Sequence, residues 1–365
     1  AFDLIPKPFS ASQLEVAVDR SVNYKQLQEQ NQELQKELRA AYQFDNVVAE
    51  SPQMSAVLDL VRKVASTEAN VLLRGESGTG KELIAHCLHQ ASGRSHGPFV
   101  PIDCASLPET LLESELFGYE KGAFTGASTS RAGLLESANG GTLFLDEIGN
   151  VSPNLQAKLL RLLEERQYRR VGGRTLVQVN ARFISATNGF LEDMVRRGAF
   201  REDLFYRLNV VSVCLPPLRD RLADLAPLAN MFLAQNPDTA AKGIEGISSA
   251  ALLMMQNYHW PGNVRELKNV IWRAVSLTES NQITPLDFPQ ELLNPGNGSF
   301  RPAGMFRQAK QQAVQQFEDG YLKQLLTETG GNVSQAARKA GIKRPALHRL
   351  LQKHKLDPSQ FRSRR

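Results

Sequence analysis

The sequence predicts an α/β protein, with a parallel sheet wrapped by helices, then a helical subdomain, then a small all-α domain at the C-terminal end. Residues 46–235 alternate short apolar runs with helical patterns, which is typical of parallel strands joined by helical crossovers. Residues 221–285 contain no comparable strand and show helical patterns such as SSAALLMMQNY and NVRELKNVIWRAVSL. From residue 301 onward the chain is strongly basic and again helical in pattern. Two helical parts therefore follow an α/β core.

The expected strands are five short runs of mainly apolar residues, 70–74 (NVLLR), 99–103 (FVPID), 142–146 (TLFLD), 182–187 (RFISAT) and 210–215 (VVSVCL). Each is short enough for a buried strand and is followed by a turn or helix signal. Residues 292–304, LLNPGNGSFRPAG, mix Pro, Gly, Asn and Ser and are predicted to be a linker.

Two segments precede the sheet. Residues 1–18 are predicted to hold the end of a strand, FDLIPKPF, and an amphipathic helix from Ser12. Residues 20–42 are rich in Gln, Glu, Lys and Leu and contain neither Gly nor Pro. Their apolar pattern places Tyr24, Asn31 and Leu38 at heptad position a, and Leu27, Leu34 and Ala41 at position d. So short a repeat leaves two alternatives, a coiled-coil dimer or a lone solvent-exposed linker helix.

Composition excludes several classes of protein. A chain of 365 residues with 42% hydrophobic and 22% charged residues is expected to form two or three soluble domains. No apolar run approaches the ~18–20 residues of a membrane span, and no signal peptide is seen, although the chain begins with Ala rather than Met. The three cysteines, at 87, 104 and 214, are far apart and predict a reducing cytoplasm rather than a disulfide framework or a zinc site.

The net charge of +5 hides a strong asymmetry. Residues 301–365 contain 14 Lys and Arg against 4 Asp and Glu, a net of +10, which leaves −5 for residues 1–300. A basic module on a mildly acidic body indicates nucleic-acid binding at the C-terminal end. A solvated basic tail would have the same composition.

A phosphate-binding loop follows the first strand. The motif GESGTGKE has the spacing of a P-loop, and it lies between a strand and a helix, as such a loop requires. Its glycines let backbone amides converge on phosphate oxygens, the helix N-terminus adds its dipole, and the lysine neutralises charge. Glu82 stands where a Mg²⁺-binding Ser or Thr is usual, so Mg²⁺ needs another carboxylate. The candidate nucleotide-binding residues are Gly75, Glu76, Ser77, Gly78, Thr79, Gly80, Lys81 and Glu82.

Two acidic residues supply that carboxylate. GGTLFLDEI is an apolar strand that ends in Asp146 and Glu147, which places both acids at the carboxyl edge of the sheet with the phosphate loop. We expect Asp146 to hold Mg²⁺ and Glu147 to polarise the attacking water. Asn188, after the strand RFISAT, is a candidate to hydrogen-bond the water or the γ-phosphate, or else a turn or helix-cap residue.

Together these motifs resemble the AAA+ ATPase domain of the NtrC-like activators of sigma-54 RNA polymerase. The likeness covers roughly residues 46–285, where GESGTGKE, ESELFGYEKGAFTGA, GGTLFLDEI, FREDLFYRLNV, LPPLRDR and WPGNVREL appear in the family's order. It implies an AAA+ P-loop core with a helical lid, ATP and Mg²⁺ as cofactors, and a loop that contacts sigma-54. That loop is Gly122, Ala123, Phe124, Thr125, Gly126 and Ala127.

The resemblance also assigns three arginines. Arg201 and Arg207 match the residues that reach into a neighbouring subunit's nucleotide site, and Arg265 matches the lid arginine that senses the γ-phosphate. By pattern alone all three pass as surface cations. Asp103 occupies a place where the family often has Asn to connect the acidic pair to the loop, which puts that switching role in doubt.

Both ends resemble modules of the same family. FDLIPKPF resembles the last strand of a response-regulator receiver, with Lys7 as its signalling lysine, although no phosphoacceptor is present in the chain. GGNVSQAARKAGIKRPALHRLLQKHKL resembles a Fis-type helix-turn-helix, with a first helix from Asn332 to Ala340 and a recognition helix from Arg344 to His354. Its candidate DNA-binding residues are Lys343, Arg344, His348, Arg349 and Lys353.

The predicted domains are a receiver remnant (1–18), a coiled-coil linker (19–45), the AAA+ core (46–220), its lid (221–291), a linker (292–304) and a helix-turn-helix domain (305–365). They predict a cytoplasmic activator that hydrolyses ATP, remodels the sigma-54 RNA polymerase closed complex, and binds double-stranded DNA upstream. The resemblance implies dimers and a ring of six or seven subunits, with no membrane partner. The alternatives are a generic AAA+ remodeller, such as a protease or helicase subunit, and a DNA-binding regulator without motor function.

Overall fold

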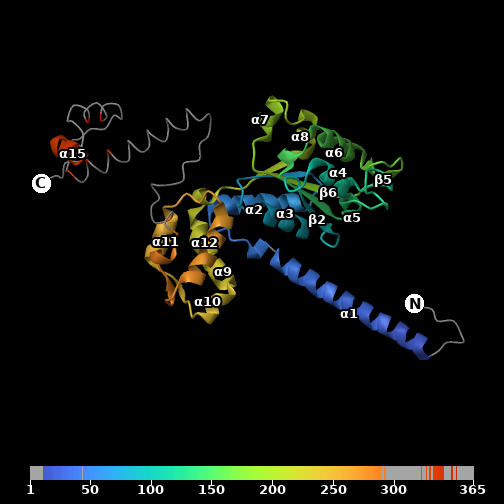
Figure 1. Cartoon of the computed structure of the whole chain (residues 1–365), viewed down its shortest axis with the longest axis horizontal. Helices are drawn as coiled ribbons and strands as arrows, with labels where there is room; N and C mark the ends of the chain where they lie inside the picture. Colours follow the sequence, from blue (N-terminus) through green and yellow to red (C-terminus); the bar gives the residue numbers. More distant parts are fainter. Residues whose placement is uncertain are drawn as a thin grey trace. The chain divides into compact units, whose positions relative to one another are not determined.

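The structure is a computed structural model that describes residues 11–42 and 44–289, with residues 292, 322, 326, 329, 332–340, 347 and 351. The chain forms two compact units, residues 1–288 and 289–365, which are considered separately. Figure 1 shows the α/β core and the lid helices α9–α12 within the first unit.

The core of the first unit is a five-stranded parallel sheet in the order β2-β3-β6-β1-β7. All five expected strands are confirmed within one residue at either end. They are β1 (Val71–Arg74), β2 (Phe99–Asp103), β3 (Thr142–Asp146), β6 (Arg182–Thr187) and β7 (Val211–Cys214). This order places β6 between β1 and β3. The phosphate loop follows β1, the acidic pair ends β3, and Asn188 follows β6. The carboxyl ends of these three strands therefore meet at one edge of the sheet.

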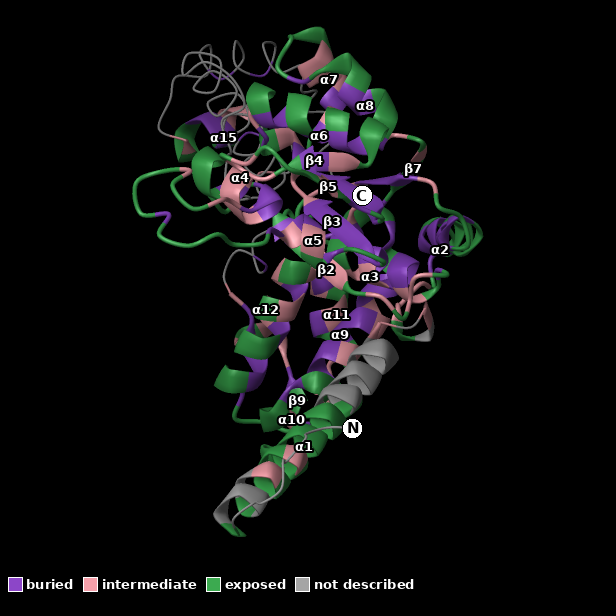
Figure 2. Ribbon diagram, turned by 90° about the vertical axis from the view of Figure 1, so that its right-hand side faces the viewer, coloured by how far each residue is buried: buried purple, intermediate pink, exposed green. Residues whose placement is uncertain are grey.

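Helices cover both faces of the sheet, and alternate side chains of each strand enter different cores. Leu143, Leu145 and Phe183 pack on one face, while Phe144 and Ile184 pack on the other. The first face is covered by α4 (Glu109–Phe117), α5 (Leu134–Ser137), α6 (Pro153–Glu165), α7 (Leu191–Arg196) and α8 (Glu202–Leu208), and the second by α2 (Pro52–Ala65) and α3 (Lys81–Gln90). Figure 2 shows the buried residues concentrated on the strands and on the helix surfaces beside them.

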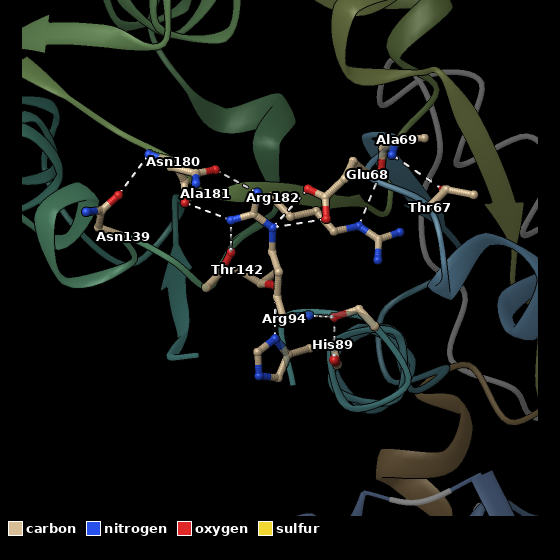
Figure 3. A network of polar contacts seen from close by, with 12 residues as sticks. Thr67, Glu68, Ala69, His89, Arg94, Asn139, Thr142, Asn180, Ala181 and Arg182 are labelled. Carbon is tan, nitrogen blue, oxygen red and sulfur yellow. Dashed lines mark hydrogen bonds and ion pairs between the residues drawn. The ribbon is translucent and has the colours of Figure 1, made fainter. Parts of the chain in front are cut away.

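The amino-terminal edge of the sheet is held by buried polar contacts (Figure 3). Arg182, which begins β6 and is 1% exposed, donates hydrogen bonds to the carbonyl oxygens of Val64 and Ala65 at the end of α2. Burial lowers the pKa of Arg182. Beside it, Arg94 donates to the carbonyl oxygen and to the side chain of Asn180. Arg182 satisfies carbonyl groups that burial would otherwise leave unpaired, and Arg94 adds bonds at the exposed Asn180, so this edge has a structural role.

A short hairpin forms a second, two-stranded sheet in the first unit. Strands β4 (Gln167–Arg169) and β5 (Leu176–Gln178) pair antiparallel after α6. No pattern in the sequence had predicted this hairpin.

The lid follows the sheet, as expected, and its helices α9 and α12 pack against each other. Trp260 and Ile271 are fully buried in its core. The elements of the lid are η3 (Leu218–Asp220), η4 (Leu222–Asp224), α9 (Leu225–Gln235), α10 (Pro237–Ala241), α11 (Ser249–Gln256), α12 (Asn263–Leu277) and η5 (Pro285–Asp287), with β8 (Gly246–Ile247) and β9 (Gln282–Ile283). The prediction that residues 221–285 contain only helices was therefore wrong in one detail, because β8 and β9 pair over two residues.

The predicted N-terminal helices form one continuous helix, α1 (Ala11–Ala41), before the short helix η1 (Phe44–Asn46). The side chains of Tyr24 and Leu27 are 56% and 65% exposed. The other heptad positions lie outside the described side chains, so the coiled-coil dimer remains a prediction. Tyr42 joins this segment to the core by stacking on His86 of α3, with ring centroids 3.9 Å apart.

In the second unit, α15 (Val333–Lys339) confirms the first helix of the predicted helix-turn-helix. The Asn332 side chain caps it by accepting hydrogen bonds from the amides of Ser334 and Gln335. Ala336 and Ala337 of this helix form a buried apolar cluster with Leu322, Leu326, Leu347 and Leu351.

Several predictions fall outside the described residues. These are the FDLIPKPF strand, the linker predicted at 292–304 except for Leu292, which is buried, and the five predicted DNA-binding residues. Within the described ranges, no helix combines the length and apolarity that crossing a bilayer requires. Cys87, Cys104 and Cys214 are all free thiols.

Candidate nucleotide site and contact loop

The phosphate loop joins β1 to α3, as the motif predicts. Gly78 and Gly80 adopt positive φ angles of 78° and 104°, a region that favours glycine. A Cβ atom at Gly78 would lie 2.3 Å from the carbonyl oxygen of Gly262 in the lid, so only glycine fits this approach. The loop therefore needs its glycines for its backbone shape and, at Gly78, for close contact with the lid.

Lys81 begins α3, and its side chain is 7% exposed. Its Nζ donates a hydrogen bond to the carbonyl oxygen of Gly75 at 3.0 Å and lies 3.6 Å from Glu147 Oε1. The phosphate-loop lysine, which follows β1 in the chain, and the predicted catalytic carboxylate, which follows β3, are therefore in contact.

Glu147 lies between two partners. Its backbone is left-handed, with φ 50°, directly after the last residue of β3. Besides contacting Lys81, its Oε2 accepts a hydrogen bond from the backbone amide of Asn188 at 3.2 Å. The Asn188 residue is exposed and does not line the nucleotide cleft described below, so its side-chain role remains a prediction.

Asp146 and Asp103 end neighbouring strands in register. Asp146 Oδ1 accepts a hydrogen bond from the Glu147 amide, and Asp103 Oδ1 accepts one from the Ala105 amide. Burial, followed by the charges of the nearby acids, raises the pKa of Cys104 to about 12. Asp103 thus adds negative charge beside the acidic pair. The described contacts of the Glu147 carboxylate are with Lys81 and the Asn188 amide.

A cleft of about 630 Å³ opens at this edge of the sheet. Lys81, Asp146 and Glu147 line one part of it, and Arg265 of the lid lines another. Its apolar lining includes Val47, Val48, Met54, Leu228, Met231 and Phe232. A charged end beside an apolar wall suits a ligand with phosphates on one side and a planar base on the other.

Arg265 lies where the resemblance places the lid arginine. It is in the first turn of α12, and its NH1 donates a hydrogen bond to the Ser77 hydroxyl at 3.0 Å. The lid arginine therefore reaches the phosphate loop of its own subunit.

Arg201 is the N-cap residue of α8 and Arg207 lies within that helix, and neither lines this cleft. The Arg201 guanidinium makes two hydrogen bonds to the Asp203 carboxylate, which lower the pKa of Asp203. Both arginines are exposed. The predicted reach into a neighbouring subunit is compatible with this exposure.

The GAFTGA segment forms an exposed loop between α4 and α5. Gly122 and Gly126 have φ angles of 85° and 107°, and the Gly122 amide donates a hydrogen bond to the Ala127 carbonyl oxygen at 2.9 Å. The Phe124 side chain is 46% exposed and meets Tyr119 edge to face, with ring centroids 5.0 Å apart. The tip thus presents an aromatic ring that the chain itself covers only in part.

The β4–β5 hairpin supports the base of this loop. A Cβ at Gly172 would lie 2.8 Å from the Ala123 side chain. Arg170 forms ion pairs with Glu120 at 3.0 Å and with Glu136 at 2.8 Å. The hydrogen bonds from Arg170 to Glu136 hold the pKa of Glu136 below its usual value.

Sequence reasoning missed three residues of the site. Arg219 and Arg221 lie in LPPLRDR and Asn263 in WPGNVREL, and all three bond the phosphate loop. Both motifs had been recognised, but only Arg265 was given a role. The sequence signal that could have identified them is that each is a hydrogen-bond donor inside a motif already recognised.

Comparisons with known proteins agree with this geometry. Family models match a "Sigma-54 interaction domain" at residues 47–214, an "AAA+ ATPase lid domain" at 219–303 and "Bacterial regulatory protein, Fis family" at 313–354. The regulatory protein AtoC of Escherichia coli K12 is 43% identical over 361 residues, which cover 98% of this chain and 78% of AtoC. The chain belongs to the sigma-54-dependent transcriptional activators.

Other relatives are consistent with this family. The transcriptional regulatory protein GlrR of Escherichia coli K12 is 45% identical, over 87% of this chain and 69% of GlrR. The Nif-specific regulatory protein of Azotobacter vinelandii is 51% identical, but the match spans only 49% of its length. Among solved structures, NtrX from Brucella abortus in complex with ADP has a TM-score of 0.65 and 35% identity, covering 97% of this chain and 78% of NtrX. This sigma-54 activator therefore shares the AAA+ fold, with a Fis-type DNA-binding domain.

Proposed function

We propose that this activator is an oligomeric ATPase that couples hydrolysis to remodelling of the sigma-54 RNA polymerase closed complex. One observation carries the proposal: a single chain combines a phosphate cleft containing Lys81 and Glu147 with an exposed Phe124 loop built on the same core. NtrX has been crystallised with ATP and with ADP, which supports nucleotide as the ligand of this cleft.

Hydrolysis needs charge neutralisation and a positioned water. Lys81, now paired with Glu147 and the Gly75 carbonyl, is placed to neutralise the β- and γ-phosphates. Glu147 is then available as the carboxylate that polarises water, with the Asn188 amide orienting it. We expect Arg265 to leave the Ser77 hydroxyl for the γ-phosphate.

Magnesium would be held with the nucleotide. Across the described residues, no group of three or more His, Cys, Asp or Glu side chains could hold a metal alone. Asp146 lines the cleft, and Glu82 replaces the usual hydroxyl ligand. Mg²⁺ would bind through Asp146, phosphate oxygens and water, and would offset the charge of the phosphates.

Two further parts complete the proposed machine. Arg201 and Arg207, which are exposed at the start of α8 and on that helix, would reach a neighbour's cleft in a ring of six or seven subunits. The basic C-terminal domain would bind double-stranded DNA at upstream enhancer sites as a dimer, through Lys343, Arg344, His348, Arg349 and Lys353.

The GAFTGA segment, residues 122–127, which we call the contact loop, provides the decisive test. Phe124→Ala removes most of the apolar area of a tip that contacts no phosphate, at a cost of about 2–4 kcal/mol of binding at a hot spot. We expect ATP turnover close to that of the parent, but loss of sigma-54 capture in the presence of an ADP–metal-fluoride mimic of the transition state. Thr125→Ala should uncouple the two activities in the same way.

The control is Leu253→Ala, which removes an exposed apolar side chain from the lid, where Leu253 is 61% exposed. It should leave capture intact. Normal capture by a folded Phe124→Ala variant would overturn the contact role. Absence of ATP turnover by the parent oligomer would favour a DNA-binding regulator without motor function.

A further inference from the structure

The phosphate loop is bonded to the lid through three consecutive carbonyl groups. The carbonyl oxygen of Ser77 accepts from Asn263 Nδ2 at 3.0 Å, and that of Thr79 accepts from Arg221 NH2 at 2.8 Å. Between them, the Gly78 carbonyl oxygen accepts from the amides of Val264 and Arg265, at 3.0 and 3.3 Å. The first turn of α12 thus donates its amides to a phosphate-loop carbonyl.

These bonds restrict the loop amides. In a trans peptide the carbonyl and the following N–H point in opposite directions. Fixing the Ser77 and Thr79 carbonyls toward the lid therefore turns the Gly78 and Gly80 amides away from it. Amide orientation is what a phosphate loop uses to bind oxygens, so lid contacts determine whether the loop is ready for nucleotide.

Asn263 is central to these contacts. It is 0% exposed and has a φ of 52°, a conformation that Asn and Asp tolerate better than most residues. Its Oδ1 accepts from the Leu218 amide at 2.8 Å, and its Nδ2 donates to the Ser77 carbonyl and to Glu76 Oε2. One amide side chain therefore joins the lid to the phosphate loop.

Glu76 completes the connection from the loop side. Its carboxylate accepts two hydrogen bonds from Arg219, at 2.6 and 2.8 Å, and these lower the pKa of Glu76. Bidentate arginine–carboxylate pairs fix orientation as well as distance. We call Glu76, Arg219 and Asn263 the lid clasp.

We propose that the lid clasp is a set of positioning residues for ATP, in which Asn263 holds the phosphate loop in its nucleotide-binding shape. The proposal rests on the ATPase function proposed above. Bound phosphate would supply its own hydrogen bonds to the loop, so a broken clasp should weaken binding and leave turnover at saturating ATP much less affected. The effect should therefore lie in KM.

The test exchanges donor and acceptor. Asn263→Asp keeps the backbone conformation and the acceptor for Leu218, but places a carboxylate against Glu76 and the Ser77 carbonyl. Glu76→Gln supplies an amide that can donate back to the new carboxylate. The matched control is Asn257→Asp, because Asn257 lies in the same lid as the C-cap residue of α11. In the described part of the chain its side-chain amide donates to the carbonyl oxygen of Leu253 in that helix, away from the phosphate loop.

We expect Asn263→Asp to raise the KM for ATP about tenfold or more, with kcat changed less than about threefold. Glu76→Gln alone should raise KM by about threefold, and adding it to Asn263→Asp should recover part of the lost affinity. Asn257→Asp should match the parent. Binding of a fluorescent ADP analogue should follow the KM values.

Each outcome decides between two models. An unchanged KM in Asn263→Asp, or a fall in kcat without a rise in KM, would overturn the clasp. If Asn263→Asp does not fold, Glu76→Gln decides, because Glu76 is partly exposed and its loss does not threaten folding. A parent protein that does not hydrolyse ATP would refute the proposed function. A parent that hydrolyses ATP, with clasp variants whose KM for ATP equals that of the parent, would refute only this inference.

Discussion

Glu147 shows how one residue can be both strained and useful. A non-glycine residue with φ 50° is uncommon, and such backbone concentrates at functional sites. Here it turns the carboxylate that follows β3 toward Lys81 and the Asn188 amide. Lys81 and Glu147 therefore neutralise each other's charge, and we expect bound nucleotide to break this pair.

Lys81 and Glu147 should therefore fail in different ways. We expect Lys81→Ala to abolish nucleotide binding, because Lys81 is the buried cation of the phosphate loop. Glu147→Gln should retain binding and lose turnover, since an amide cannot accept the proton of the attacking water. Equilibrium binding of ATP and steady-state phosphate release would separate the two effects.

Glu68→Gln is a suitable control, because Glu68 pairs with Arg94 on the opposite edge of the sheet. It should not alter either measurement beyond its effect on the amount of folded protein. Hydrolysis by Glu147→Gln at the parent rate would contradict the assignment of the acidic pair.

At the scale of elements, local apolar patterns in the sequence predicted the strands of the sheet. They did not predict features that depend on contacts between residues far apart in the chain. The apolar runs at β1, β3 and β6 are fully or almost fully buried, and their composition alone indicated strands. Strands β4 and β5 span three residues each, too short for any periodicity to indicate them. The bond from Asn263 to Glu76 joins residues 187 positions apart, and no local rule connects them.

The candidate site divides in the same way. The phosphate loop, Lys81 and the acidic pair carry local signatures, and the structure brings Lys81 and Glu147 together. The placements of Arg201 and Arg265 came from family resemblance, because an isolated arginine on a helix has no signature of its own. The hairpin under the contact loop had neither kind of signal.

That hairpin gives a prediction that depends on pH. Hydrogen bonds from Arg170 lower the pKa of Glu136 from 4.5, so ionised Glu136 stabilises the folded state. This stabilisation is fully present above pH 4.5 and is lost as the pH falls through the lower folded-state pKa. Glu136→Gln should therefore reduce the free energy of unfolding at neutral pH, by about 1–2 kcal/mol, and the difference should close in acid.

Denaturant unfolding of parent and variant from neutral pH to below the carboxylate range would measure this. Glu165→Gln is the matched control, because Glu165 pairs with Arg161 on an exposed helix surface, where ion pairs contribute little. A deficit for Glu136→Gln that stayed constant with pH would show that lost packing, rather than the ion pair, causes it.

At the scale of the whole molecule, the cleft and the DNA-binding domain lie in parts of the chain with opposite net charge. The net −5 of residues 1–300 accompanies the cleft and the contact loop, while the net +10 of residues 301–365 accompanies the Fis-type domain. The cleft lacks one expected component, since neither Arg201 nor Arg207 lines it. Hydrolysis should then require a second subunit.

Specific ATPase activity should therefore rise steeply with protein concentration, because the proposed site would be complete only where two subunits meet. Arg201→Ala should be inactive although its own cleft is intact, and Glu147→Gln should be inactive although its own Arg201 is intact. Mixing the two inactive proteins should restore activity, since a sound cleft then meets a sound arginine at about a quarter of the interfaces of a random ring.

The mixing experiment distinguishes the two places where Arg201 could act. An arginine that acted within its own subunit would leave every subunit of the mixture with one defect, and the mixture would stay inactive. Sedimentation of each variant must first show assembly equal to that of the parent, because Arg201 also pairs with Asp203 at the start of α8. Recovery of activity in a mixture of equally assembled variants is the result we expect, and flat specific activity from dilute to concentrated parent would contradict it.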